Sequence, residues 1–201
     1  MVDLLLRRRE IIAAQHISIP EWDYMWDYTQ GVPTVGGWTL SKSGTTSTSM
    51  VSDGCKMTAN NSSNINYNMD SASTSKGVYE VQFYIPTNGK KSVGQGNFRF
   101  GNSSTCVFVV FYVTSGGVRE IRKWNKSGMA SGTKIGSFSF DTVYTLRITL
   151  DGTADIELNG TALATGTAAD AYYKGSPRFG IQNAGGSSIV FQSAKLRIGR
   201  T

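Results

Sequence analysis

Acidic side chains are the first groups in this sequence to consider for catalysis, because hydrolysis of a sugar bond needs two carboxylates flanking it. Glu80 and Glu120 have no acidic residue within three positions. The single histidine, His16, lies close to the N-terminus. A catalytic serine or cysteine is usually activated by a histidine base. No histidine is available for this in the rest of the chain. We expect no catalytic residues and no enzymatic activity.

Clustered cations beside a tryptophan suggest a different chemistry, the binding of an anionic glycan or of another acidic surface. Arg119, Arg122 and Lys123 lead directly into Trp124. Guanidinium groups pair with carboxylates and stack on rings, which suits this task. We take these four residues as the candidate glycan-binding site. The alternative is an ordinary polar edge of a sheet that happens to carry a tryptophan.

Four aromatic residues near the start of the chain alternate in sequence, so one side of a strand could carry all of them. Such a row could form a platform for a sugar, together with Trp38. The interpretation we favour is that the row faces the protein core, where large aromatic side chains contribute most buried area. The four residues are Trp22, Tyr24, Trp26 and Tyr28.

The composition predicts an all-β protein. Its 201 residues include 23 glycines, and only 17% are charged. Short runs of Val, Ile, Phe and Tyr are separated by small polar residues, which is typical of many strands and turns. The net charge of +6 comes without a dense basic patch, so we expect no nucleic-acid partner. No apolar run is long enough for a membrane span.

Several segments have the alternation of half-buried strands, among them residues 77–86 and 143–150. Residues 106–113 are apolar on both faces, which predicts a central strand covered on each side, or one with a ligand or partner over its outer face. The pairs Asp151-Gly152 and Asn159-Gly160 predict two hairpins. About twelve to fourteen strands in this order predict an antiparallel two-sheet jelly-roll sandwich over residues 21–201. We expect its core to include Val81, Phe83, Val109, Phe111, Leu146, Ile148 and Leu196.

Residues 1–20 differ from the rest and are expected to form an anchor segment and a linker. Residues 1–16 contain no Gly, Pro, Ser or Thr and consist largely of helix-forming types. On a helix their apolar residues spread around most of the circumference, so no single stripe could dock onto the chain's own sandwich. We expect an assembly anchor, helical or extended, that inserts into a partner. The alternative is a helix packed against a second copy of itself. The anchor residues are Leu4, Leu5, Leu6, Arg7, Arg8, Arg9, Ile11 and Ile12.

The two cysteines, Cys55 and Cys106, cannot make a disulfide framework and are expected to be small buried side chains. The leucines at the N-terminus precede the arginines, which is the reverse of a secretory signal. We therefore expect assembly in a reducing cytoplasm.

The order of these segments resembles the concanavalin A-like lectin/glucanase superfamily, which includes laminin G-like domains. The resemblance rests on three blocks: G-x-Y-E-V-Q-F at 77–83, Y-T-L-R-I-T-L-D-G-x-A-D-I-E-L-N-G at 144–160, and P-R-F-G-I-Q-N at 177–183 followed by residues 193–199. In addition, L-L-L-R-R-R-E-I-I-A-A-Q and the later W-D-Y-x-W-D-Y resemble the starts of structural proteins encoded by phages of gut bacteria.

The superfamily resemblance implies two kinds of site, and the sequence departs from both. Its glucanases carry a strand motif E-x-D-x-x-E, but here Trp26 replaces the last acidic residue after Glu21 and Asp23. Its lectins often hold calcium with oxygen ligands from loops. The available aspartates form no acidic cluster, and we interpret them as turn residues, expecting no metal and no cofactor. These aspartates are Asp53, Asp70, Asp151 and Asp155.

Three functional hypotheses remain. The first is a non-enzymatic phage virion protein, a capsid or tail-appendage module, that displays a lectin-like sandwich for attachment to a surface or glycan. Its partners would be other virion proteins bound through residues 1–16, further copies of itself, for example in a trimer, and a host-surface glycan. The second is a stand-alone carbohydrate-binding module of a gut bacterium. The third is a divergent glycoside hydrolase.

Overall fold

The computed structural model describes residues 21–60, 63–69, 76–87, 93–101, 106–124, 132–168, 177–184 and 187–201. In these ranges the chain forms strands and two short 3-10 helices, η1 (Tyr28–Gln30) and η2 (Pro33–Gly36), with no α-helix. This confirms the predicted all-β class. No helix in these ranges is long and apolar enough to cross a membrane. The predicted anchor, residues 1–16, and its linker lie outside the described residues.

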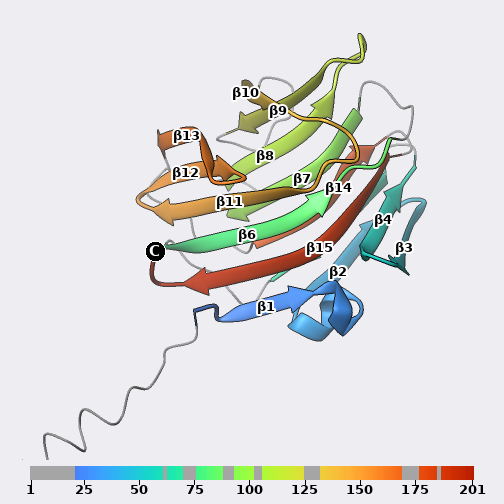
Figure 1. Cartoon of the computed structure of the whole chain (residues 1–201), viewed down its shortest axis with the longest axis horizontal. Helices are drawn as coiled ribbons and strands as arrows, with labels where there is room; N and C mark the ends of the chain where they lie inside the picture. Colours follow the sequence, from blue (N-terminus) through green and yellow to red (C-terminus); the bar gives the residue numbers. More distant parts are fainter. Residues whose placement is uncertain are drawn as a thin grey trace, which may run out of the picture.

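Eight strands form the first sheet, sheet A. Seven follow the order β13-β12-β11-β6-β15-β4-β3, and β1 pairs with β15 beside this path (Figure 1). Each pairing in the sheet is antiparallel. The strands are β1 (Tyr24–Asp27), β3 (Thr46–Val51), β4 (Gly54–Ala59), β6 (Lys76–Tyr84), β11 (Tyr144–Asp151), β12 (Thr153–Leu158), β13 (Thr161–Ala168) and β15 (Ser187–Ile198).

Seven antiparallel strands form the second sheet, sheet B, in the order β10-β9-β8-β7-β14-β5-β2. The two sheets make the predicted antiparallel sandwich. Fifteen strands are present in the described ranges, slightly more than predicted, because short Ser- and Thr-rich strands carry few apolar residues that would mark them in the sequence. The strands of sheet B are β2 (Thr39–Ser43), β5 (Ser63–Asn68), β7 (Val93–Gly101), β8 (Cys106–Val113), β9 (Arg119–Trp124), β10 (Thr133–Ser137) and β14 (Pro177–Ala184).

The core between the sheets is rich in aromatic side chains. Phe83 of β6 lies at its centre, with ring centroids 4.4 Å from Phe98 and 5.0 Å from Phe111. These contacts join sheet A to sheet B, and aromatic pairs at such distances stabilise a fold beyond their buried area. All seven predicted core residues are buried: Val81, Phe83, Val109, Phe111, Leu146, Ile148 and Leu196.

The aromatic row at the start of the domain faces the core for most of its length, as predicted. Trp26 is fully buried, and its Nε1 donates a hydrogen bond of 2.9 Å to the carbonyl oxygen of Gly31. Tyr24 and Tyr28 are partly buried and pack against the same core. Trp22 differs, because its ring lies beneath the cationic groups of β15 instead.

The two predicted hairpins are also present, linking β11, β12 and β13. Asn159 and Gly160 both have positive φ, 50° and 75°, as a type I′ turn requires. The Oδ1 atom of Asn159 accepts a hydrogen bond of 2.8 Å from the backbone N–H of Thr145, which ties the turn between β12 and β13 to the neighbouring strand β11.

Candidate glycan-binding face

The outer face of sheet B, the side turned away from the core, contains the candidate site. Strand β8 runs near its middle and is buried on both sides, as predicted. Val107, Val109, Phe111 and Val113 point into the core. Phe108, Val110 and the partly buried Tyr112 form a separate apolar cluster on the outer face.

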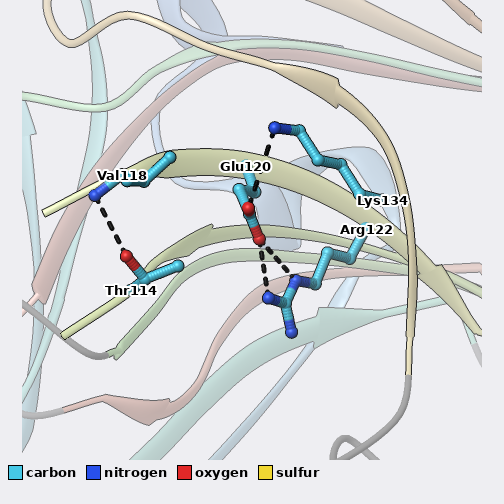
Figure 2. Close-up of polar contacts among 5 residues, drawn as sticks. All are labelled: Thr114, Val118, Glu120, Arg122 and Lys134. Atoms are coloured by element: carbon cyan, nitrogen blue, oxygen red, sulfur yellow. Dashed lines mark hydrogen bonds and ion pairs between the residues drawn. The ribbon is translucent and has the colours of Figure 1, made fainter. Parts of the chain in front are cut away.

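Arg122 extends this outer face onto strand β9 (Figure 2). Its guanidinium contacts Glu120 Oε2 through Nε, at 2.8 Å, and through Nη2, at 2.6 Å. Its Cζ atom lies 4.8 Å from the centroid of the Tyr112 ring. Lys134 Nζ reaches the other oxygen of Glu120 at 3.7 Å. The flat guanidinium is therefore held over an aromatic ring and oriented by a carboxylate.

This arrangement lowers the pKa of Glu120 below its ordinary value. The main cause is the hydrogen bond from Arg122, and the positive charges of Arg122 and Lys134 act in the same direction. Glu120 is therefore ionised at neutral pH and acts as a partner for Arg122, and it is not suited to be a general acid.

The turn between β8 and β9 positions this pair (Figure 2). The backbone N–H of Val118 donates to Thr114 Oγ1 at 3.0 Å, and the N–H of Thr114 donates to the carbonyl oxygen of Val118 at 2.9 Å. Gly117 has a φ of 82°, which closes the turn at no steric cost. The hairpin holds β9 in register, with Glu120 opposite Tyr112.

The four residues of the predicted glycan-binding site do not all share one side of β9. Arg119 and Lys123 lie opposite Val113 and Val109, which face the core, so both occupy the inner side of the strand near its edge. Arg119 covers the ring of Phe140, at 5.5 Å. Arg122 occupies the outer side. The backbone of Trp124 pairs with Phe108, and its side chain lies outside the described residues.

A polar pocket of about 180 Å³ lies at the other end of the outer face, where β2, β5 and β14 meet. Asn66 is only 6% exposed, and its Oδ1 has no hydrogen-bond partner in the described structure. Nδ2 of Asn64 donates to Ser43 Oγ at 3.3 Å. The pocket is therefore lined by hydroxyl, amide and cationic groups, from Ser41, Lys42, Ser43, Asn64, Asn66 and Arg178.

Gly180 of β14 keeps this region open. A Cβ atom at position 180 would lie 2.7 Å from Asn66 Oδ1 and 2.1 Å from the carbonyl oxygen of Ile65. Any larger residue would therefore push β14 away from β5 or displace the Asn66 amide. Our sequence analysis did not identify these residues. The alternation of Asn64, Asn66 and Asn68 with two core residues was the available signal.

The pocket and Arg122 lie on one line that crosses the strands of sheet B. The pairing register runs from Ser41 through Asn66 and Gly180 to β7, and from there through Val110 to Arg122. At roughly 4.8 Å between strands, the seven strands from β2 to β10 span about 29 Å. This outer face is long enough for several sugar units.

Several carboxylates of the described residues have structural partners. Asp23 accepts a hydrogen bond from the backbone N–H of Ile198 at 2.6 Å and pairs with Arg200 at 3.1 Å, which gives it a structural role. On sheet A, Asp155 and Glu157 share the outer side of β12, a pair to which our sequence analysis gave no weight. Asp155 accepts from the N–H of Gly166, and Glu157 lies opposite Arg147.

The described part of the chain also contains no group of three or more His, Cys, Asp or Glu residues that could hold a metal ion. Two of the aspartates considered for calcium have side-chain partners: Asp53 accepts from the Tyr84 hydroxyl, and Asp151 pairs with Lys76 at 2.8 Å. Asp70 lies outside the described residues.

Cys55 is buried, as predicted, and burial raises the pKa of its thiol to about 11. The thiol therefore stays protonated at neutral pH and is not a nucleophile. The side chain of Cys106 is outside the described part.

Comparisons with solved structures find the same β-sandwich fold in other proteins. No family model matches the chain, and no curated protein matches its sequence. The carbohydrate recognition domain of Emp46p superposes with a TM-score of 0.64 at 12% identity, over 88% of this chain and 97% of that one. A carbohydrate esterase from the Shiga toxin-encoding bacteriophage phi24B gives 0.60 at 14% identity, over 89% and 97%. A sialidase gives 0.65 at 11% identity, over 89% of this chain but only 19% of the sialidase.

At these identities the likeness concerns the fold. The matched structures also include the carbohydrate-binding module CBM66 from Bacillus subtilis, with a TM-score of 0.56 at 16% identity, over 80% of this chain and 95% of that one. The chain therefore has a lectin-like jelly-roll fold.

Proposed function

We propose that this chain is a non-enzymatic structural protein of a phage virion, a module of the capsid or of a tail appendage, that binds a host-surface glycan through the outer face of sheet B. It would be assembled in the cytoplasm of the host bacterium and would act in the virion. Its partners would be other virion proteins, bound through residues 1–16, and further copies of itself.

The observation that supports glycan binding most strongly is the line of groups from the pocket at Asn66 to Arg122. Amide and hydroxyl groups such as those of Asn64, Asn66 and Ser41 hydrogen-bond to sugar hydroxyls. The half-buried Arg122 is already oriented by Glu120, so little ordering is needed on binding. The lectin-like fold is consistent with this use of a sheet face.

The proposal of a binding role without catalysis rests on how the carboxylates are used. Glu120 is paired with Arg122, Asp23 with Arg200, and Glu80 with Lys195 at 3.2 Å. Glu80 and Lys195 join β6 to β15, whereas Glu120 and Arg122 lie on the same strand, β9. A retaining hydrolase instead needs one protonated and one free carboxylate about 5 Å apart.

The virion role rests on the sequence of residues 1–16 and on its resemblance to phage structural proteins. Five apolar side chains and three consecutive arginines suit insertion into a partner's groove, where the arginines would meet carboxylates. The fold itself also occurs in a phage-encoded protein.

Glycan binding is tested by applying the full chain to an array of bacterial surface oligosaccharides. We expect binding that falls at least tenfold in Arg122→Ala and stays unchanged in Arg147→Ala, a matched arginine on the outer face of sheet A. Absence of binding to every glycan, or equal loss in both variants, would contradict the proposed site.

A stand-alone carbohydrate-binding module is the second candidate, because this chain matches 95% of the length of one such module, CBM66. Attachment to phage particles distinguishes the virion protein from the stand-alone module. If the chain is a virion protein, it co-purifies with phage particles, and a chain without residues 1–16 loses this attachment but retains its glycan binding. A chain that never associates with particles is instead a free module.

A further inference from the structure

We propose that the pocket between β2, β5 and β14 binds the carboxylate of an acidic sugar, such as a uronic or sialic acid residue within a glycan. This inference rests on the proposed glycan-binding function and narrows it to a substrate class.

Charge is the first argument. The described residues that line the pocket include no carboxylate, and Arg178 is their cation on the outer face; Lys42 lies opposite the core residue Ile65, on the inner side of β2. Arg178 is half-buried near the start of β14, and it stands directly opposite Arg99 of β7. Arg178 at the pocket, with Arg99 on the adjacent strand, makes this end of the face attractive to an anion. Arginine also matches the planar geometry of a carboxylate.

The neutral groups of the pocket suit the remainder of a sugar. Asn66 Oδ1 is buried and has no donor in the described structure, and a sugar hydroxyl would supply one. Asn64 and the Ser41 hydroxyl line the same space. Buried polar atoms in folded proteins nearly always have a partner, so an atom without one in an open pocket points to a ligand.

The pocket's shape limits the ligand to one sugar unit at this end. Its volume of about 180 Å³ is below the range of sites for drug-sized ligands, roughly 300–1,000 Å³. The lack of a side chain at Gly180 leaves the sheet flat beside Asn66. With an acidic sugar bound here, the other sugar units of the glycan could extend across sheet B toward Arg122.

The test compares binding of the full chain to two acidic probes, trigalacturonic acid and sialyllactose, with binding to their carboxyl-reduced counterparts, by titration calorimetry. We expect binding of at least one acidic probe to weaken at least tenfold when its carboxylate is reduced. Arg178→Gln should lose a similar factor, and Arg147→Gln on the outer face of sheet A should change affinity less than twofold. Ser41→Ala, at an exposed pocket position opposite Asn66, should weaken binding about threefold.

Different failures have different meanings. Binding that is equal for acidic and reduced probes, or unaffected by both Arg178→Gln and Ser41→Ala, would overturn the acidic-sugar inference while leaving glycan binding intact. Binding to neither form of either probe would also overturn it. Only a full chain that binds no glycan on the array would remove the proposed function itself.

Discussion

Arg99 of β7 and Arg178 of β14 stand directly opposite each other in an antiparallel pair, on the outer face of sheet B. Directly opposed residues have Cβ atoms about 5 Å apart, and like charges at this distance destabilise a sheet. If the proposed acidic sugar binds beside Arg178, its carboxylate would reduce this repulsion, which would link folding to binding at this position.

A double-mutant cycle measures this relationship. Arg99→Gln and Arg178→Gln, alone and together, should give a repulsive coupling of about 0.2–1 kcal/mol in the free energy of unfolding. The coupling should shrink as salt rises from about 0.05 to 0.5 M, because ions screen exposed charges. Urea denaturation supplies the four values, and an attractive coupling would show that the two arginines cooperate in holding the sheet.

Replacement of Gly180 tests the close approach of β14 to β5. In Gly180→Ala the new methyl group meets the Ile65 carbonyl oxygen and the Asn66 amide, so we expect a loss of about 1–3 kcal/mol in the free energy of unfolding. The matched control is Gly116→Ala, where the nearest atom to a Cβ lies at 3.8 Å, and the change should stay below about 1 kcal/mol. Urea denaturation measures both variants. Similar denaturation midpoints would mean that β14 can move away from β5 without a loss of stability.

Truncation of Phe83 tests the aromatic core. Its ring contacts Phe98 and Phe111 of the opposite sheet and Phe191 of its own, so Phe83→Ala should cost about 3–5 kcal/mol. Val118→Ala, at a side chain that is 52% exposed, should cost less than about 0.5 kcal/mol. Thermal unfolding followed by circular dichroism compares them, and a loss under 1 kcal/mol for Phe83→Ala would contradict the packing.

The ion pair on β9 predicts a pH dependence. The pKa of Glu120 lies below its ordinary 4.5 because of the hydrogen bond from Arg122. The pair therefore contributes its full stability above about pH 4.5, and this is lost as the pH falls through the lower pKa of the folded state. In Arg122→Gln the pKa of Glu120 should rise toward 4.5, whereas Arg147→Gln should leave it unchanged. Carboxyl-carbon NMR titration gives both values, and an unchanged pKa in Arg122→Gln would contradict the pairing.

Local patterns in the sequence were enough to predict the class of fold, the turn at Asn159-Gly160 and the inward face of β8, because these depend on neighbouring residues. The placement of β14 between β7 and β5 depends on pairing between distant segments, which no local pattern specifies. That placement brings Arg178 beside Asn66. Similarly, alternation shows that Arg122 and Lys123 lie on opposite sides of β9, but not which side faces the core.

The central claim, that a glycan lies along the outer face of sheet B, is tested most directly by NMR. Backbone amide shifts of the full chain would be followed as a glycan identified on the array is added. The account predicts that the perturbed amides cluster around Ser41, Asn66 and Arg178 and continue across the sheet to Arg122, while those around Glu80 and Arg147 on sheet A stay unchanged. Perturbations confined to the outer face of sheet A would contradict it.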